Sequence, residues 1–327
     1  MSQVHNAFTL FISLLVEAIP FLLLGVLLSS SLLFLINEKQ LLNKLPTNPF
    51  LGAIVGSLIG FLFPVCECGN VPVARRLLLQ GVSPGVAIAF LLAAPTINPI
   101  VIWSTWVAFG DRPEIVIFRV IFSSAIAICI GWVFSSQKTA ENILQTNFAQ
   151  RYQAVKPKDS ISPLLQSGTF IIQQGKTIPM NDTLISQGNS SSFEGKWQAF
   201  LENVWQEFSE LGGVLVLGSA VAAMIQVFVP REFIFNLGHD PISSILAMML
   251  LAAVVSICST VDSFFALSFA TTFTSGSLLA FLVFGPTIDI KSIGLMATIF
   301  KPKIIVYIFT LVAQLTFIFT LTYSYFF

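Results

Sequence analysis

The fold is decided by a break in an apolar region, at Phe63-Pro64-Val65-Cys66-Glu67-Cys68-Gly69-Asn70-Val71-Pro72. Its prolines and its glycine prevent a straight helix, because proline lacks a backbone donor and clashes with the preceding turn. A second break follows at Pro95-Thr96-Ile97-Asn98-Pro99. The helical pieces between such breaks are about eleven residues long, and at about 1.5 Å per residue they span half a bilayer. Unwound backbone is tolerated at membrane depth only beside protein or water, so these breaks predict a buried binding site.

The composition around these breaks is that of a membrane protein. Hydrophobic residues make up 55% of the chain and charged residues 10%, whereas a soluble domain carries about 25% charged residues. Apolar runs approach or exceed the roughly 20 residues that span a bilayer, and they lie at 7–36, 50–65, 82–109, 115–134, 211–229, 242–261, 264–288 and 304–327. The formal net charge is zero, so no bulk field attracts nucleic acid. We predict an all-α polytopic protein in a lipid bilayer, with no nucleic-acid partner.

The same residue types, among them proline, glycine, cysteine and glutamate, recur in the same order in the two halves of the chain. Matching positions are Glu17 with Glu210, Gly25 with Gly218, Pro49 with Pro241, Cys66 with Cys258, Asn70 with Asp262, and Asn98 with Asp289. The partners lie 193 residues apart at the start of this series and 191 at its end. Leucines align by accident in membrane segments, whereas proline, glycine, cysteine, carboxylate and amide residues that match in order indicate an internal repeat. They predict a first membrane repeat at 1–134, a polar cytoplasmic linker at 135–198 and a second membrane repeat at 199–327.

The placement of basic residues indicates how the two repeats lie in the membrane. If the linker is cytoplasmic, the loop with Lys301 and Lys303 lies on the same side, as the positive-inside rule requires. An inverted first half also puts the basic loop at 39–44 inside. These placements favour inverted repeats of about five membrane segments each, with broken or half-length helices at matched positions. Arg75 does not fit this topology, because it would lie within the membrane or outside it.

The cysteines Cys66, Cys68 and Cys258 are candidates for binding a solute. The repeat predicts that they converge, and thiolates prefer soft centres such as copper(I), zinc or a trivalent metalloid. A structural zinc site usually has four ligands including histidine, and both histidines lie outside the breaks. We therefore predict no resident metal and no cofactor. Two alternatives stay open: the cysteines fill a tight break as small residues, or they form a redox pair, although C-x-x-C is the usual redox spacing.

Ionisable and amide side chains inside the membrane segments are the other candidates, since an unpaired buried charge costs several kcal/mol. The predicted repeat pairs Glu17 with Glu210, which strengthens the case for a functional role, and we predict that they couple transport to protons. Helix breaks place four further candidates for solute binding, namely Asn70, Asn98, Asp262 and Asp289. Arg75 could bind an anion beside a helix N-terminus. Arg119 is expected to extend from near a helix end toward the membrane surface.

The stretch from Cys66 to Arg76, followed by 81–85 and 89–99, resembles the ArsP/YraQ family of predicted permeases (UPF0718/DUF318-like). The segment around Cys258, Asp262 and Asp289 is similar to the second signature of that family. The resemblance implies a multi-pass permease of the cytoplasmic membrane, and some members export trivalent organoarsenicals. Where relatives have a small residue between the two cysteines, this chain has Glu67.

Three function hypotheses follow. The first is a secondary permease, and no enzyme, that exports a trivalent organoarsenical or another thiol-reactive compound (metalloid efflux) under the drive of protons. No P-loop motif is present that would supply ATP energy. The second is a permease for a small anion that binds Arg75. The third is a membrane thiol oxidoreductase or scaffold without transport. A homo-oligomer is compatible with all three.

Overall fold

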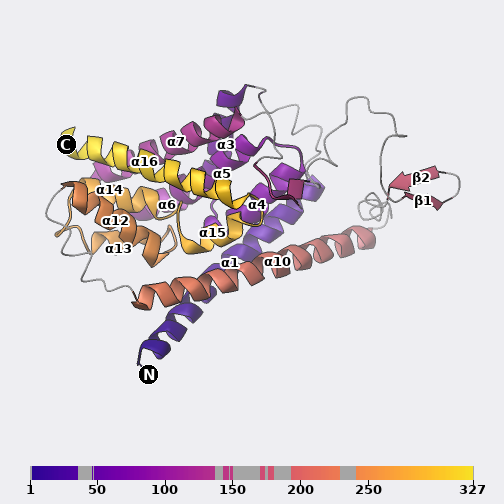
Figure 1. Cartoon of the computed structure of the whole chain (residues 1–327), viewed down its shortest axis with the longest axis horizontal. Coiled ribbons are helices and arrows are strands. Elements are labelled where there is room, and N and C mark those ends of the chain that lie inside the picture. Colours follow the sequence, from indigo (N-terminus) through magenta and orange to yellow (C-terminus); the bar gives the residue numbers. More distant parts are fainter. Residues whose placement is uncertain are drawn as a thin grey trace.

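The computed structural model is built of helices (Figure 1) and describes residues 2–35, 46, 48–136, 143–146, 148–149, 170–173, 176–179, 193–228 and 241–326. Within these residues, five helical spans are long and apolar enough to cross a membrane: His5–Ser31, Pro84–Ala108, Pro113–Ser135, Phe200–Val227 and Pro302–Phe326. The prediction of an all-α polytopic membrane protein is therefore confirmed.

Each half runs through its helices in the same order. The first half consists of α1 (Ser2–Leu35), α3 (Pro49–Leu62), α4 (Glu67–Leu79), α5 (Pro84–Ile97), α6 (Pro99–Ala108) and α7 (Pro113–Ser135). The second half consists of α10 (Phe193–Phe228), α12 (Pro241–Val255), α13 (Asp262–Leu267), α14 (Ser275–Phe284), α15 (Ile290–Met296) and α16 (Pro302–Phe326). Between them, β1 (Phe170–Gln173) and β2 (Lys176–Pro179) pair antiparallel.

The predicted breaks are present in both halves. Residues 63–66 separate α3 from α4, and Asn98 alone separates α5 from α6. In the second half, residues 256–261 separate α12 from α13, and 285–289 separate α14 from α15. Pro72 lies inside α4, so the first break is shorter than the sequence stretch that predicts it.

The short helices that follow the breaks meet across the two halves. Helix α4 contacts α15, and α6 contacts α13. The long helices α1 and α10 also contact each other and lie crossed along one side of the molecule (Figure 1). Because α4 and α13 follow matching breaks, as do α6 and α15, these contacts are reciprocal. Such contacts are what a repeat would produce, while the inverted relation of the halves and their boundaries stay predictions.

Close helix packing in the first half relies on missing side chains. Helix α3 contacts α5, and a Cβ atom added at Gly56 would lie 2.5 Å from the carbonyl oxygen of Val86. A Cβ atom at Gly60 would lie 2.9 Å from the backbone nitrogen of Ala94. The glycines at four-residue spacing therefore let the two backbones approach, as small residues do in membrane helices.

The start of the predicted polar linker is a packed part of the protein. Leu144 forms a β-bridge with Phe300, and the backbone nitrogen of Gln145 donates to the oxygen of Ile299 at 2.8 Å. The side chains of Leu144 and Phe148 are buried. The expectation of a solvated segment is wrong for these residues, because their apolar side chains find a place beside the loop before α16. Most of the remaining linker lies outside the described residues, as does the basic loop at 39–44.

Candidate functional site

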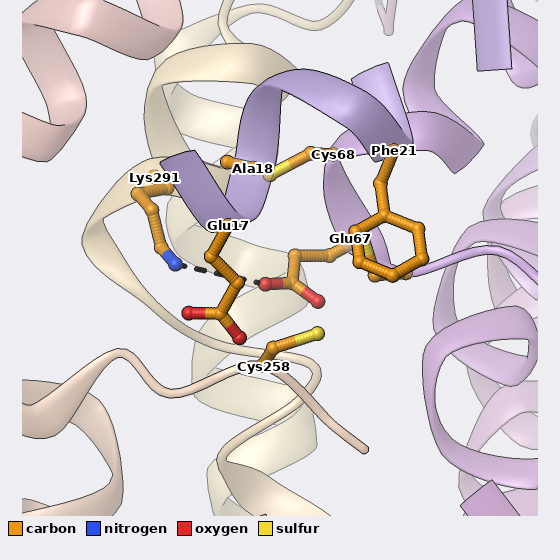
Figure 2. A pocket seen from close by; sticks show the side chains of 8 residues that line it. Glu17, Ala18, Phe21, Glu67, Cys68, Cys258 and Lys291 are labelled. Atoms are coloured by element: carbon orange, nitrogen blue, oxygen red, sulfur yellow. Dashed lines mark ion pairs between the residues drawn. The ribbon is translucent and has the colours of Figure 1, made fainter. Parts of the chain in front are cut away.

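A small pocket lies where the first breaks of the two halves meet, and we call it the thiol pocket (Figure 2). It is lined by Glu17, Ala18, Phe21, Cys66, Glu67, Cys68, Cys258 and Lys291. Cys66 directly precedes α4, and Cys258 lies in the break before α13. Their sulfur atoms and a carboxylate oxygen of Glu67 all lie within 4.8 Å of one another, and the three residues are buried. The structure thus brings together the cysteines that the repeat pairs, and Cys68 lines the same pocket.

A buried lysine faces this pocket. The Nζ atom of Lys291 lies 3.9 Å from Oε1 of Glu67 and 3.7 Å from Oδ2 of Asp289. Figure 2 shows the side chains of Lys291, Glu67 and Glu17 pointing toward one another. Sequence reasoning missed Lys291, although one signal was available: it is the one lysine or arginine between residues 263 and 300. A cation so deeply buried is stabilised by the carboxylates around it.

Asp289 supports this lysine by capping the helix that carries it. Its Oδ1 atom accepts a hydrogen bond from the backbone nitrogen of Ser292 at 2.6 Å, and the backbone nitrogen of Asp289 donates to Ser292 Oγ at 3.1 Å. This reciprocal pair is a capping box, which satisfies backbone donors at the start of α15. The matching residue, Asn98, caps α6 by accepting from the backbone nitrogen of Val101 at 2.8 Å.

Besides Asp289, five predicted site residues lie outside the thiol pocket: Asn70, Arg75, Asn98, Glu210 and Asp262. The Nδ2 atom of Asn70 donates to the oxygen of Val65 at 3.0 Å, which holds the chain at the first break. The Nδ2 atom of Asn98 donates to the oxygen of Ala94 at 2.9 Å. Both amides therefore stabilise the helix breaks, and their contact with a solute stays a prediction.

Arg75 and Glu210, predicted separately as an anion site and a proton site, form an ion pair. The Nη2 atom of Arg75 donates to the two carboxylate oxygens at 2.9 and 3.0 Å. The guanidinium carbon also lies 5.7 Å from the ring centre of Phe148. The pair joins α4 to α10 and lines a cavity of about 450 Å³, which we call the arginine pocket. Its other lining residues are Gln145, Phe148, Val214, Gly294, Ala297 and Thr298.

Arg119 and Asp262 form a second ion pair, fully buried between α7 and α13. Nη2 of Arg119 donates to Oδ2 of Asp262 at 2.7 Å, and Nη1 donates to Oδ1 at 3.2 Å. Nη1 also donates to the hydroxyls of Thr105 and Ser263 at 2.8 and 2.9 Å. The expected extension of Arg119 to the membrane surface is therefore wrong, because a carboxylate from the other half satisfies it inside the protein. Asp262 is engaged by this arginine, so a structural role accounts for its burial.

The comparisons with known proteins agree with this architecture. A sequence model of the ArsP family, described as a predicted permease, matches residues 3–325. The chain belongs to this family of predicted permeases. The permease is 37% identical over 302 residues to UPF0718 protein YcgR of Bacillus subtilis, which covers 92% of this chain and 91% of that protein. No solved structure matches it.

Two further relatives extend the comparison. The permease is 32% identical over 304 residues to a Streptococcus mutans protein named "Putative two-component membrane permease complex subunit", covering 93% of this chain and 90% of that one. It is 38% identical over 76 residues to UPF0718 protein YraQ of Escherichia coli, covering 23% and 22%. The predicted family resemblance is confirmed. The protein is a multi-pass membrane permease, and the names of its relatives indicate a transporter in place of an enzyme.

Proposed function

We propose that this permease exports a small thiol-reactive solute, such as a trivalent organoarsenical, across the cell membrane through the thiol pocket. The observation that carries the proposal is the approach of Cys66 and Cys258, which come from different halves and lie within 4.8 Å with Glu67. A solute bound to both sulfur atoms would hold the two halves together. Rocking of one half against the other could then expose the pocket to either side in turn.

The chemistry of a trivalent arsenical suits this pair of thiols. A neutral arsenical that carries two hydroxyl groups can form two arsenic–sulfur bonds, and each thiol proton leaves with one hydroxyl group as water. Sulfur is a soft ligand and should prefer arsenic(III) to hard cations. Cys68 lines the same pocket, so a third thiol is available to take over a bond as the solute moves.

Serine substitution of either cysteine should abolish this transport. In everted membrane vesicles, we expect accumulation of a trivalent phenylarsenical by Cys66→Ser and Cys258→Ser to fall to the level of vesicles without the permease. The matched control is Cys129→Ser, because the Cys129 thiol is exposed on α7 and is not among the residues that line the thiol pocket. Undiminished accumulation by both pocket variants would refute the role of the thiols.

Protons are proposed as the driving ion, through Glu17 and Glu210. Glu17 lines the thiol pocket, and Glu210 lines the arginine pocket. In Glu210→Gln the amide oxygen can still accept a hydrogen bond from the buried guanidinium of Arg75, so we expect the variant to fold. Solute accumulation driven by a pH gradient should nevertheless fall, whereas the exposed Glu202→Gln on the same helix should behave as wild type. Full accumulation by both Glu17→Gln and Glu210→Gln would argue against proton coupling.

A small anion is the second candidate solute, and the arginine pocket favours it. Arg75 is buried, and its Nη1 atom has no hydrogen-bond partner among the residues that the structure describes. An anion would bind there by adding to the Glu210 contact or by displacing it. Under this alternative, Arg75→Gln would abolish transport and Cys66→Ser would have little effect.

An oligomer or a second subunit is also proposed. The Streptococcus mutans relative is named as a subunit of a two-component complex, and this permease matches it over most of both chains. Because the family is described as a predicted permease and the Streptococcus mutans relative is named a permease subunit, transport is proposed in preference to thiol oxidoreduction.

A further inference from the structure

We propose that the thiol pocket binds a thiophilic divalent cation, of the zinc or cadmium class, through Cys66, Cys258 and Glu67. This inference rests on the proposed function, because it names the class of solute that the same pocket carries. The three donor atoms lie within 4.8 Å of one another and come from both halves of the molecule. In a tetrahedral zinc site, bonds of about 2.0–2.3 Å place neighbouring ligand atoms roughly 3.5–3.8 Å apart. The observed separations therefore need only small side-chain movements to close around an ion.

Glu67 is the residue that points to a cation. Its side chain is 7% exposed, and its Oε2 atom is buried without a hydrogen-bond partner in the described part of the chain. A buried carboxylate oxygen that lacks a partner is costly, whereas coordination to a metal ion would satisfy it. An arsenical bound through sulfur makes no use of this oxygen. Cysteine and histidine alone did not supply enough ligands for zinc in the sequence. In the structure, the carboxylate of Glu67 joins the two cysteines.

The number of ligands suits an ion that is carried and released. Structural zinc sites hold four protein ligands, while sites with three protein ligands keep one position open for water or another molecule. An open position lets an incoming thiol or water displace a ligand, and Cys68 lines the same pocket. Two thiolates and one carboxylate also favour zinc and cadmium over magnesium and calcium, which prefer oxygen ligands alone.

The charges around the pocket predict that a bound divalent cation replaces two protons. The groups that face it are Glu17 from α1, Glu67 and Cys68 from α4, Lys291 from α15, and the two ligand cysteines. Asp289 lies beyond, in contact with Lys291. When a divalent cation binds, the two thiol S–H bonds break, two metal–sulfur bonds form and two protons leave. The total charge of the pocket is then unchanged, which avoids the cost of adding charge inside the membrane.

Proton release distinguishes this cation from an arsenical. A divalent cation that replaces two thiol protons releases both to the solvent. An arsenical that bears two hydroxyl groups takes up the thiol protons as water and releases none. The two ligand classes can therefore be separated on the same purified protein, without any measurement of transport.

The experiment titrates the full-length permease in detergent, in weak buffer with a pH indicator, with cadmium and then with zinc. We expect about two protons released per bound cation, with a cadmium–thiolate absorption band that rises in parallel. Glu67→Gln should weaken cadmium binding by roughly 10- to 100-fold, since even the loss of an outer partner of a metal ligand costs this much. Phenylarsenical binding to Glu67→Gln should be unchanged. Cys129→Ser is the control for thiols outside the pocket.

Each outcome decides the inference. A permease that binds phenylarsenical without proton release, and binds neither cadmium nor zinc, overturns the cation site and leaves the proposed function intact. Cation binding with two protons released, but with no transport of either solute class in vesicles, supports the site and overturns the proposed function. Equal cadmium affinity in wild type and Glu67→Gln refutes the role of the carboxylate. If a variant fails to fold, the proton count on the wild-type protein still decides between the two classes.

Discussion

Replacing Arg119 with methionine is expected to destabilise the permease by about 3–5 kcal/mol, because it leaves the carboxylate of Asp262 buried without its cation. The two side chains are 1% and 3% exposed and share two hydrogen bonds, at 2.7 and 3.2 Å. The hydroxyls of Thr105 and Ser263 also accept from Arg119 and would lose their donor. The loss is large because both side chains are buried away from bulk solvent that could replace these bonds.

The double variant Arg119→Met with Asp262→Leu provides the critical comparison. Apolar side chains of similar volume often replace a buried ion pair at little cost, so we expect the double variant to recover most of the lost stability. Arg112→Met, at the exposed start of α7, is the matched single control. Thermal unfolding of the purified proteins in one detergent would measure all three. Wild-type stability of Arg119→Met would show that the ion pair contributes nothing to the contact between the halves.

Gly25→Ala is the second substitution with a large expected effect. A Cβ atom at Gly25 would lie 2.2 Å from the carbonyl oxygen of Gly69 and 2.5 Å from its Cα atom. These are backbone atoms of α4, so no side chain can rotate away. Helix α4 would have to move from α1, and its first turn carries Glu67 and Cys68. We expect a loss of at least about 3 kcal/mol, at the upper end of overpacking effects, together with loss of ligand binding in the thiol pocket.

Glycines on α10 are matched controls with the opposite expected sign. A Cβ atom at Gly212 or Gly213 would meet nothing within 4 Å. Alanine there should stabilise the helix by about 0.5–1 kcal/mol. Gly218, which the repeat pairs with Gly25, should also tolerate alanine, since its nearest new contact is the Cα atom of Lys291 at 3.4 Å. If Gly25→Ala and Gly213→Ala were equally stable, the close approach of α1 to α4 would be disproved.

Helix breaks and their pairing could be predicted from the sequence because proline and glycine act locally. A proline removes its own backbone donor wherever the chain goes, which predicts the interruptions before Cys66 and at Asn98. Their bounds do not follow from residue type, because Pro72 and Pro95 lie inside α4 and α5. The predicted repeat then identifies their partners at Cys258 and Asp289, because equivalent positions in two copies are expected to fold alike. The approach of Cys66 to Cys258 agrees with this pairing.

Partners of the buried charges could not be predicted in the same way. Arg119 and Asp262 are 143 residues apart, and Arg75 and Glu210 are 135 apart, so no local spacing connects them. Lys291 lies between two apolar runs of the sequence, and its approach to Glu67 depends on the packing of α15 against α4. The buried segment around Leu144 could not be predicted either, because the composition after residue 135 is polar. A few apolar side chains are enough to pack a short segment against the protein.

Membrane insertion can therefore be inferred from the amino-acid sequence, which also predicts where the helices break and which cysteines correspond. These properties depend on composition and on the chemistry of single residues. The packing of the two halves places Glu67 and Lys291 beside the thiols, and it brings carboxylates of the second half to Arg119 and Arg75. The physical reason is that a charge in a low-dielectric interior must find an opposite charge in space, and the chain path that supplies it is set by packing across both halves.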